Sequence, residues 1–125
     1  MSGTPDLRVR TKQLALRVIK VVSALPPSEV GRTLGKQLLR CGTSVGANYR
    51  EATRARSPAE FASVLHISLR ECEETAFWLE LLVEGDIVPA AQLAALRDDV
   101  RGLIALAGDD LTAYRAWRDR RAGAA

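Results

Sequence analysis

Three glutamates, Glu51, Glu71 and Glu74, are the residues of this chain most suited to acid–base chemistry or to holding a metal ion. Carboxylates alone do not define a chemistry. The sequence shows no nucleophile–base pair, no second type of metal ligand and no glycine-rich phosphate loop next to a strand. We therefore predict no enzymatic activity and no cofactor. A stoichiometric metal ion in the purified protein would reopen the enzymatic alternative.

The remaining reactive side chains, Cys41, Cys72, His66 and Ser44, lead to the same prediction. Two cysteines are too few for a disulfide framework, and the only histidine has no Glu-x-x-His pattern around it. We expect no metal site and two buried, reduced thiols. The Ser44 hydroxyl is expected to bond back to the carbonyl one turn earlier rather than to act as a nucleophile.

A second interpretation of the glutamates is structural. If the helices on either side of residues 55–57 fold back on each other, Arg40 comes near Glu74 and Cys41 near the level of Cys72. We predict a buried polar network that fixes the register of these helices, with Arg40 neutralising Glu74. The predicted network comprises Asn48, Glu51, Glu71 and Glu74.

Basic side chains form three groups that could contact phosphates. The first is Arg8 with Lys12, and the second is a row at i, i+4 and i+8. The row comprises Arg32, Lys36 and Arg40, and the third group comprises Arg115, Trp117, Arg118, Arg120 and Arg121. Arginines with exposed aromatic residues are typical of nucleic-acid-binding proteins, through phosphate contacts and base stacking. The alternative is a solvated face, with C-terminal charges that suit the helix dipole.

The composition bounds the class of protein. The chain has 125 residues, of which 47% are hydrophobic and 26% charged, and a net charge of +3. These values predict one soluble domain over residues 1–125. No apolar run approaches the roughly 18 residues needed to span a membrane, and residues 1–6 lack the apolar core of a signal peptide. We expect a cytoplasmic protein with no membrane contact.

Apolar residues recur at helical spacing along the whole chain. The pattern predicts helices at about 6–25, 28–54, 58–84 and 89–107, with a candidate extension at 109–121 after an interruption at residues 108–110. Asp6, Ser28 and Ser57 are suitable N-caps, and Glu60 would complete a capping box with Ser57. Short loops between the helices predict an all-α, antiparallel up-down-up-down four-helix bundle.

Glycines give the second helix an unusual face. Gly31 and Gly35, then Gly42 and Gly46, each repeat at four residues, which lets another helix approach closely. The first helix has an apolar stripe wider than one packing seam needs, because Leu16 and Ile19 lie beside it. We therefore expect an oligomer that buries the excess apolar surface.

Two segments resemble a known family. Residues 42–52 (GTSVGANYREA), followed by Arg54-Ala55-x-Ser57, and the pattern over residues 61–82 (FxxxLxISLRECxETxxWLxLL) are similar to the two signatures of the bacterial four helix bundle protein family. That family includes proteins encoded within 23S ribosomal RNA intervening sequences. The resemblance implies a bundle that assembles into a ring or barrel, typically a homopentamer, without catalytic activity. It also implies that Asn48, Glu51, Glu71 and Glu74 serve the fold or the assembly.

The family has a branch, the accessory proteins of diversity-generating retroelements, that works with a reverse transcriptase and nucleic acid. Those accessory proteins are strongly basic, whereas the charge of this chain is modest. From its basic groups, our leading hypothesis is a non-enzymatic oligomer associated with nucleic acid, RNA in particular. The alternative is a scaffold for protein interactions without direct nucleic-acid binding. The expected partners are further copies of this chain, RNA or DNA, and a nucleic-acid-processing protein.

Overall fold

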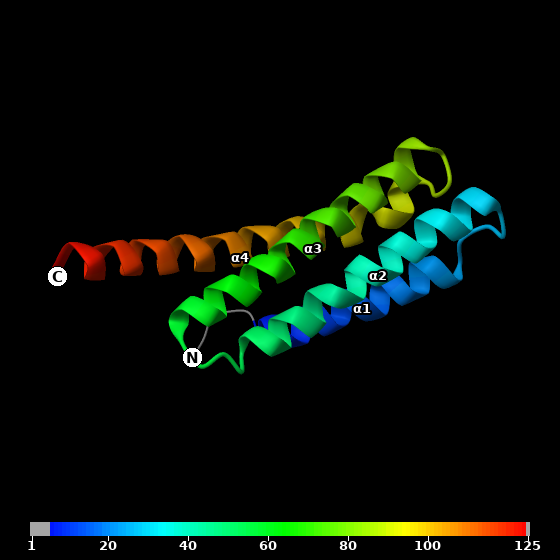
Figure 1. The fold of residues 1–125 in the computed structure, drawn as a ribbon. Helices are drawn as coiled ribbons and strands as arrows, with labels where there is room; N and C mark the ends of the chain where they lie inside the picture. Colours follow the sequence, from blue (N-terminus) through cyan, green and yellow to red (C-terminus); the bar gives the residue numbers. More distant parts are fainter. Residues whose placement is uncertain (1–5, 125) are drawn as a thin grey trace.

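The computed structural model describes residues 6–124, which form four helices and no strand (Figure 1). The helices are α1 (Leu7–Ser23), α2 (Glu29–Ala52), α3 (Pro58–Glu84) and α4 (Ala90–Ala124). They pack side by side, α2 against α1 and α3, and α4 against α3 and α1. The prediction of an all-helical, four-helix fold is confirmed.

The helix starts follow the predicted caps. The side chains of Asp6, Ser28 and Ser57 each accept a hydrogen bond from a backbone N–H of the first turn, as N-caps do. The predicted capping box at Ser57 is only half formed. The Glu60 carboxylate accepts from the backbone N–H of Arg56 at 3.2 Å, one residue before the expected position.

The glycines of α2 receive α1. An added Cβ at Gly42 would lie 2.8 Å from the Val18 side chain, and one at Gly46 would lie 3.3 Å from the Thr11 carbonyl oxygen. The expected close approach of another helix is thus confirmed, and the approaching helix is α1. Because residue numbers fall along α2 as they rise along α1, the two helices run in opposite directions.

Polar contacts join two further helix pairs, α2–α3 and α1–α4. The buried Ser68 hydroxyl on α3 donates to the Val45 carbonyl on α2 at 2.7 Å. Arg10 on α1 pairs with Asp99 on α4 at 2.7 Å, and Arg17 contacts the same carboxylate at 3.5 Å. These contacts place each helix against two neighbours around a shared interior.

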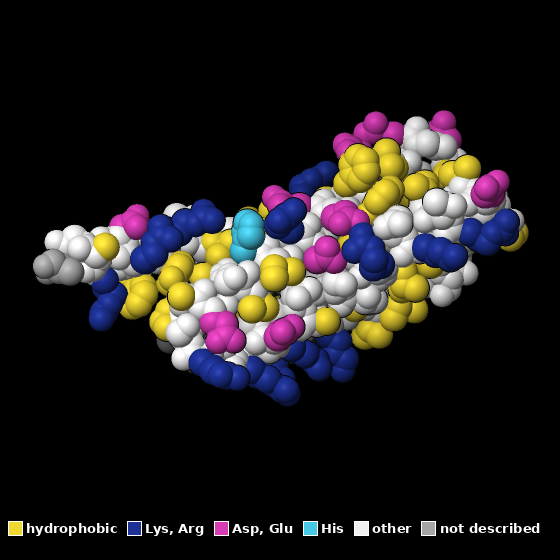
Figure 2. All heavy atoms as spheres, in the orientation of Figure 1, with side chains coloured by type: hydrophobic (Ala, Val, Ile, Leu, Met, Phe, Trp, Pro, Cys, Tyr) yellow, Lys and Arg dark blue, Asp and Glu magenta, His cyan; other side chains and the backbone are white. Residues whose placement is uncertain are grey.

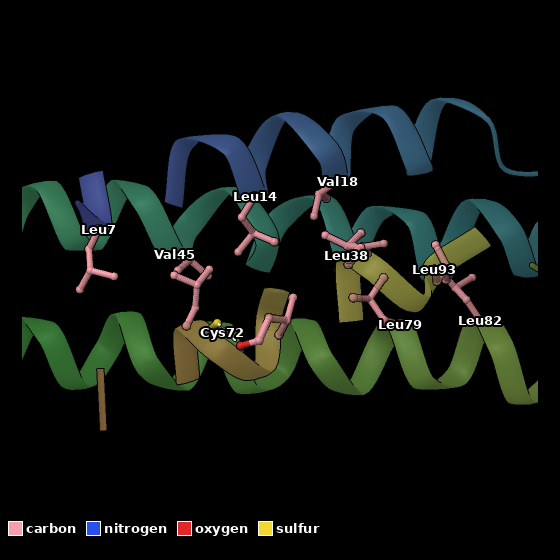
Figure 3. Packing of buried hydrophobic residues seen from close by; sticks show 12 residues of the cluster. Leu7, Leu14, Val18, Leu38, Val45, Cys72, Leu79, Leu82 and Leu93 are labelled. Carbon is pink, nitrogen blue, oxygen red and sulfur yellow. Dashed lines mark hydrogen bonds between the residues drawn. The ribbon is translucent and has the colours of Figure 1, made fainter. Parts of the chain in front are cut away.

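The interior is aliphatic (Figure 3). Its main cluster consists of Leu7, Leu14, Val18, Leu38, Val45, Cys72, Leu79, Leu82, Leu93, Leu96, Val100 and Leu103. Both cysteines are buried and free, as expected. Burial raises the pKa of Cys41, and it raises the pKa of Cys72 to about 12, so both remain thiols at neutral pH.

The expected interruption at residues 108–110 is wrong, because α4 continues unbroken from Ala90 to Ala124. A helical glycine costs only about 1 kcal/mol relative to alanine. Beyond Gly108, Leu111 is buried in a second cluster with Ala62, Leu65 and Ala107, which holds the helix in place. The last turns extend past the ends of the other helices (Figure 1). We call residues 112–124 the C-terminal arm.

Candidate nucleic-acid interface

The best-connected polar group joins α2 to α3. The Arg40 guanidinium donates to the carboxylates of Glu71 and Glu74, and also to the Gln37 side chain. The Trp78 indole N–H donates to the same Glu74 carboxylate at 2.9 Å. The predicted pairing of Arg40 with Glu74 is confirmed. The Arg40 side chain is 49% exposed, so this ion cluster lies at the surface between α2 and α3, and the prediction of a buried network is wrong.

Asn48 and Glu51 lie outside this group, so the predicted four-residue network is wrong for both. The Asn48 amide donates to the Ser44 carbonyl of its own helix at 2.9 Å. Glu51 is exposed. It lies eleven residues beyond Arg40, about 16 Å along the helix axis, which is too far to share that cation. The Ser44 hydroxyl donates to the Arg40 carbonyl at 2.7 Å, as predicted.

Arg8 and Lys12 lie in a surface hollow of about 430 Å³ between the start of α1 and the end of α2. Arg50 lines it as well, so three cations from two helices meet there. The one carboxylate in the hollow, Asp6, is occupied as the N-cap of α1. We call this site the basic hollow. Its other lining residues are Val9, Gln13 and Leu16.

Arg50 was not among the predicted site residues. The contact that reveals it is the packing of Gly46 against Thr11. Arg50 lies one turn after Gly46, and Arg8 lies nearly one turn before Thr11. Because the helices run in opposite directions, the two arginines reach the same level. The glycine spacing in the sequence contained this signal, once it is combined with the register of α1.

Arg32 and Lys36 stand elsewhere, at the rim of a groove of about 310 Å³ near the start of α2. The floor of the groove is apolar and glycine-rich, and it includes Leu25, Gly35 and Leu39. Arg32 also donates to the Pro27 carbonyl at 3.0 Å. Eighteen residues separate Arg32 from Arg50, about 27 Å along α2, so the groove and the basic hollow are separate sites.

The third basic group lies on the C-terminal arm. Arg115, Trp117, Arg118, Arg120 and Arg121 are all exposed there. Figure 2 shows several basic side chains on this projecting end of the molecule, with others spread over the rest of the visible face. The groove with Arg32 and Lys36 is thus separate from the basic hollow, and the arm carries its basic residues on a third element, α4.

The chain is similar to a known protein family and to a solved structure. The family model of the 23S rRNA-intervening sequence proteins matches residues 6–108. The chain belongs to this family. No protein of curated function matches it. A solved structure from Bacteroides thetaiotaomicron, described as a protein of unknown function from the S23 ribosomal protein family, is 32% identical with a TM-score of 0.80. The match covers 85% of this chain and 98% of that one.

Some of the candidate sites lie inside the residues that match the family model, and one lies outside them. Arg40, Glu71, Glu74 and the basic hollow lie within the matched residues 6–108. The C-terminal arm lies after them. The arm therefore lies outside the matched residues, and its chemistry has to be argued from its own side chains.

The described residues also bear on metal binding and on membrane insertion. Within residues 6–124, no three histidine, cysteine or carboxylate side chains come close enough together to hold a metal ion. In the same part of the chain, no helix combines the length and the apolar character that crossing a bilayer requires. His66 is exposed on α3.

Proposed function

We propose that this member of the 23S rRNA-intervening sequence family is a non-enzymatic, cytoplasmic oligomer that associates with nucleic acid, RNA in particular. The observation that carries the proposal is the basic hollow. Arg8, Lys12 and Arg50 converge there from two helices, and the neighbouring Asp6 is occupied as a helix cap. Three cations around one concave surface attract phosphates, and phosphate contacts dominate nucleic-acid affinity.

The proposal includes the assembly. We take the fold as an up-down-up-down bundle of antiparallel helices, which the opposed contacts along α1–α2 and α2–α3 support. Apolar side chains outside the basic hollow, Ile19 on α1 and Ile67 and Phe77 on α3, are exposed at 43%, 48% and 48%. Their burial between copies would give the ring, a homopentamer by family resemblance. A ring repeats the basic hollow, so a weak site gains affinity through multivalency.

The first test is a binding titration with labelled RNA and DNA at low and high salt, on protein of verified oligomeric mass. We expect affinity to fall steeply with salt. The variant Arg8→Glu/Lys12→Glu should lose at least tenfold in affinity at low salt. The matched control Arg32→Glu/Lys36→Glu changes the same charge at the distant groove and should lose less. Equal losses would show that net charge, rather than the hollow, governs binding.

A protein-interaction scaffold is the second candidate, and the groove beside Arg32 and Lys36 favours it. Its apolar floor and basic rim suit an acidic amphipathic segment of a partner, such as a nucleic-acid-processing protein. A stoichiometric partner retained after nuclease treatment, and lost in Leu39→Glu, would support the scaffold. Loss of every partner on nuclease treatment would count against it.

A further inference from the structure

The C-terminal arm carries one ordered stripe of aromatic and basic side chains. Tyr114, Trp117, Arg118 and Arg121 follow the i, i+3, i+4, i+7 spacing that places residues on one helix face. The rings of Tyr114 and Trp117 lie 5.8 Å apart. The Arg118 guanidinium lies 6.0 Å from the centre of the Tyr114 ring, and that of Arg121 lies 5.0 Å from the Trp117 ring. The stripe is thus a stack in which guanidinium groups cover aromatic faces.

The stripe continues the buried side of α4 into solvent. Ala107 and Leu111 precede it on that side and are buried in the second cluster, against which Tyr114 also packs. Trp117 remains 38% exposed. From residue 115 onward every side chain whose burial is described is exposed, so Tyr114 is the residue of the arm that packs against the bundle. A helical face of this kind, left without a neighbour, indicates a binding partner.

The positive charge of the arm indicates the class of partner. Four of the 18 basic residues and one of the 15 acidic residues lie in the arm, which leaves 14 of each in the rest of the chain. The arm therefore accounts for the whole net charge of +3. Its acidic residue, Asp119, pairs with Arg118 at 3.2 Å. Within residues 6–124, Arg115 and Arg120 have no ion-pair partner. The partner should be an anion with extended charge.

A second copy of the arm fits this face poorly. Parallel packing of two arms along their stripes would bring Arg118 and Arg121 against the same cations of the other copy, which is repulsive. Antiparallel packing would still place four arginines and no carboxylate of the stripe in one interface. An acidic peptide could satisfy the arginines, but it would leave the Trp117 face without a flat partner. A single strand of nucleic acid offers both phosphates for the guanidinium groups and flat bases for the indole.

We infer that the arm is a binding site for single-stranded nucleic acid, in which a base displaces the Arg121 guanidinium from the Trp117 ring and stacks there, while Arg118 and Arg121 contact the flanking phosphates. The inference deepens the proposed function and rests on it, because it names the form of nucleic acid and a site for it separate from the basic hollow. Duplexes present phosphates but keep their bases stacked inside, so they can engage the arginines and not the indole.

The experiment uses the full chain and a labelled 12-nucleotide oligouridine, oligothymidine or duplex RNA. Trp117→Ala should weaken oligouridine binding at least tenfold, and Trp117→Phe, which keeps a stacking ring, should stay within about threefold of the parent. Arg118→Ala/Arg121→Ala should lose more affinity than Arg115→Ala/Arg120→Ala, which removes the same charge from other faces of the arm. In a Trp78→Phe background, the remaining Trp117 fluorescence should be quenched by the single strands and not by the duplex.

Several outcomes would overturn the inference. They are unchanged affinity in Trp117→Ala, equal losses in the two double-arginine variants, and equal quenching by duplex and single strand. If Arg8→Glu/Lys12→Glu abolishes binding while Trp117→Ala binds like the parent, the proposed function stands and the arm site fails. If Trp117→Ala abolishes binding while the hollow variant binds normally, the arm site stands and the hollow fails as the carrier of function. Equal affinity for oligouridine and oligothymidine would support binding through stacking of a base on Trp117 rather than through contacts to the sugar.

Discussion

The bundle and the C-terminal arm share the helix α4, yet different interactions hold them. In the bundle, α1 and α2 approach so closely that Gly42 leaves no room for a Cβ beside Val18. In the arm, an added Cβ at Gly123 would meet nothing within 4 Å. The bundle is neutral and aliphatic inside, whereas the arm carries the net charge and exposes its aromatic residues. The bundle is therefore specified by close packing, whereas the arm exposes the side chains for which we propose a binding role.

The largest expected effect comes from the same substitution made in both regions. Gly42→Ala should destabilise the protein by about 1–2 kcal/mol, since overpacking against the fully buried, stiff Val18 outweighs the gain in helix propensity. Gly108→Ala, at the base of the arm, meets no atom within 4 Å and should stabilise by up to about 1 kcal/mol. Urea unfolding measures both. Changes of the same sign would contradict the distinction between the two regions.

A second contrast concerns arginines. Arg40→Met should cost about 1 kcal/mol, because it leaves the carboxylates of Glu71 and Glu74 without their shared cation. Arg115→Met, in the arm, should change stability by less than about 0.3 kcal/mol because Arg115 is exposed and forms no ion pair within residues 6–124. The comparison is best made by urea unfolding at 0.1 M and 1 M NaCl. The Arg40 effect should shrink at high salt, and an unchanged effect would mean that lost packing dominates.

The buried Cys72 thiol should make the stability of the bundle depend on pH. The pKa of Cys72 is raised by burial from 9.0 to about 12, so above pH 9 the unfolded chain loses this proton while the folded chain keeps it. Stability from this group is therefore full below pH 9 and should fall by about 1 kcal/mol by pH 10. Urea midpoints at pH 8, 9 and 10 measure the slope, and Cys72→Ala should flatten it. An equal slope in that variant would assign the effect to other groups.

The smallest expected effect is that of removing the exposed arm. Deletion of residues 115–125 keeps Leu111 and Tyr114, which pack against the second cluster. We expect the free energy of unfolding to change by less than about 0.5 kcal/mol, since the described side chains after residue 114 are exposed. A loss above 1 kcal/mol would show that the arm contributes to folding and would weaken its assignment as a binding element.

Local signals in the sequence predicted the fold well, because each of them depends on near neighbours. Asp6, Ser28 and Ser57 cap their helices, and the glycines of α2 receive another helix. Arg40 and Glu74 were paired correctly because a short turn fixes the level at which α2 faces α3.

The predictions that were wrong depended on distance along a helix, or on a weak helix-breaking residue that competed with the burial of an apolar residue. Glu51 shares a face with Arg40 but lies too far along the axis to join its ion cluster. Gly108 is a weak helix breaker, and the burial of Leu111 beyond it outweighs that preference. Arg50 was missed because its role depends on the register between α1 and α2, which no single segment of the sequence contains.

The unbroken course of α4 through Gly108 sets the phase of the stripe. Each residue of an α-helix turns the chain by about 100° and advances it by about 1.5 Å, so Trp117 is aimed by the same rotation that buries Leu111. One residue inserted between them would swing the stripe about 100° away from the bundle side. Four inserted residues would nearly restore its direction and move it about 6 Å outward. Because the helix is continuous, the number of inserted residues sets both the direction in which the stripe faces and its distance from the bundle. These two properties can be changed separately by the choice of that number.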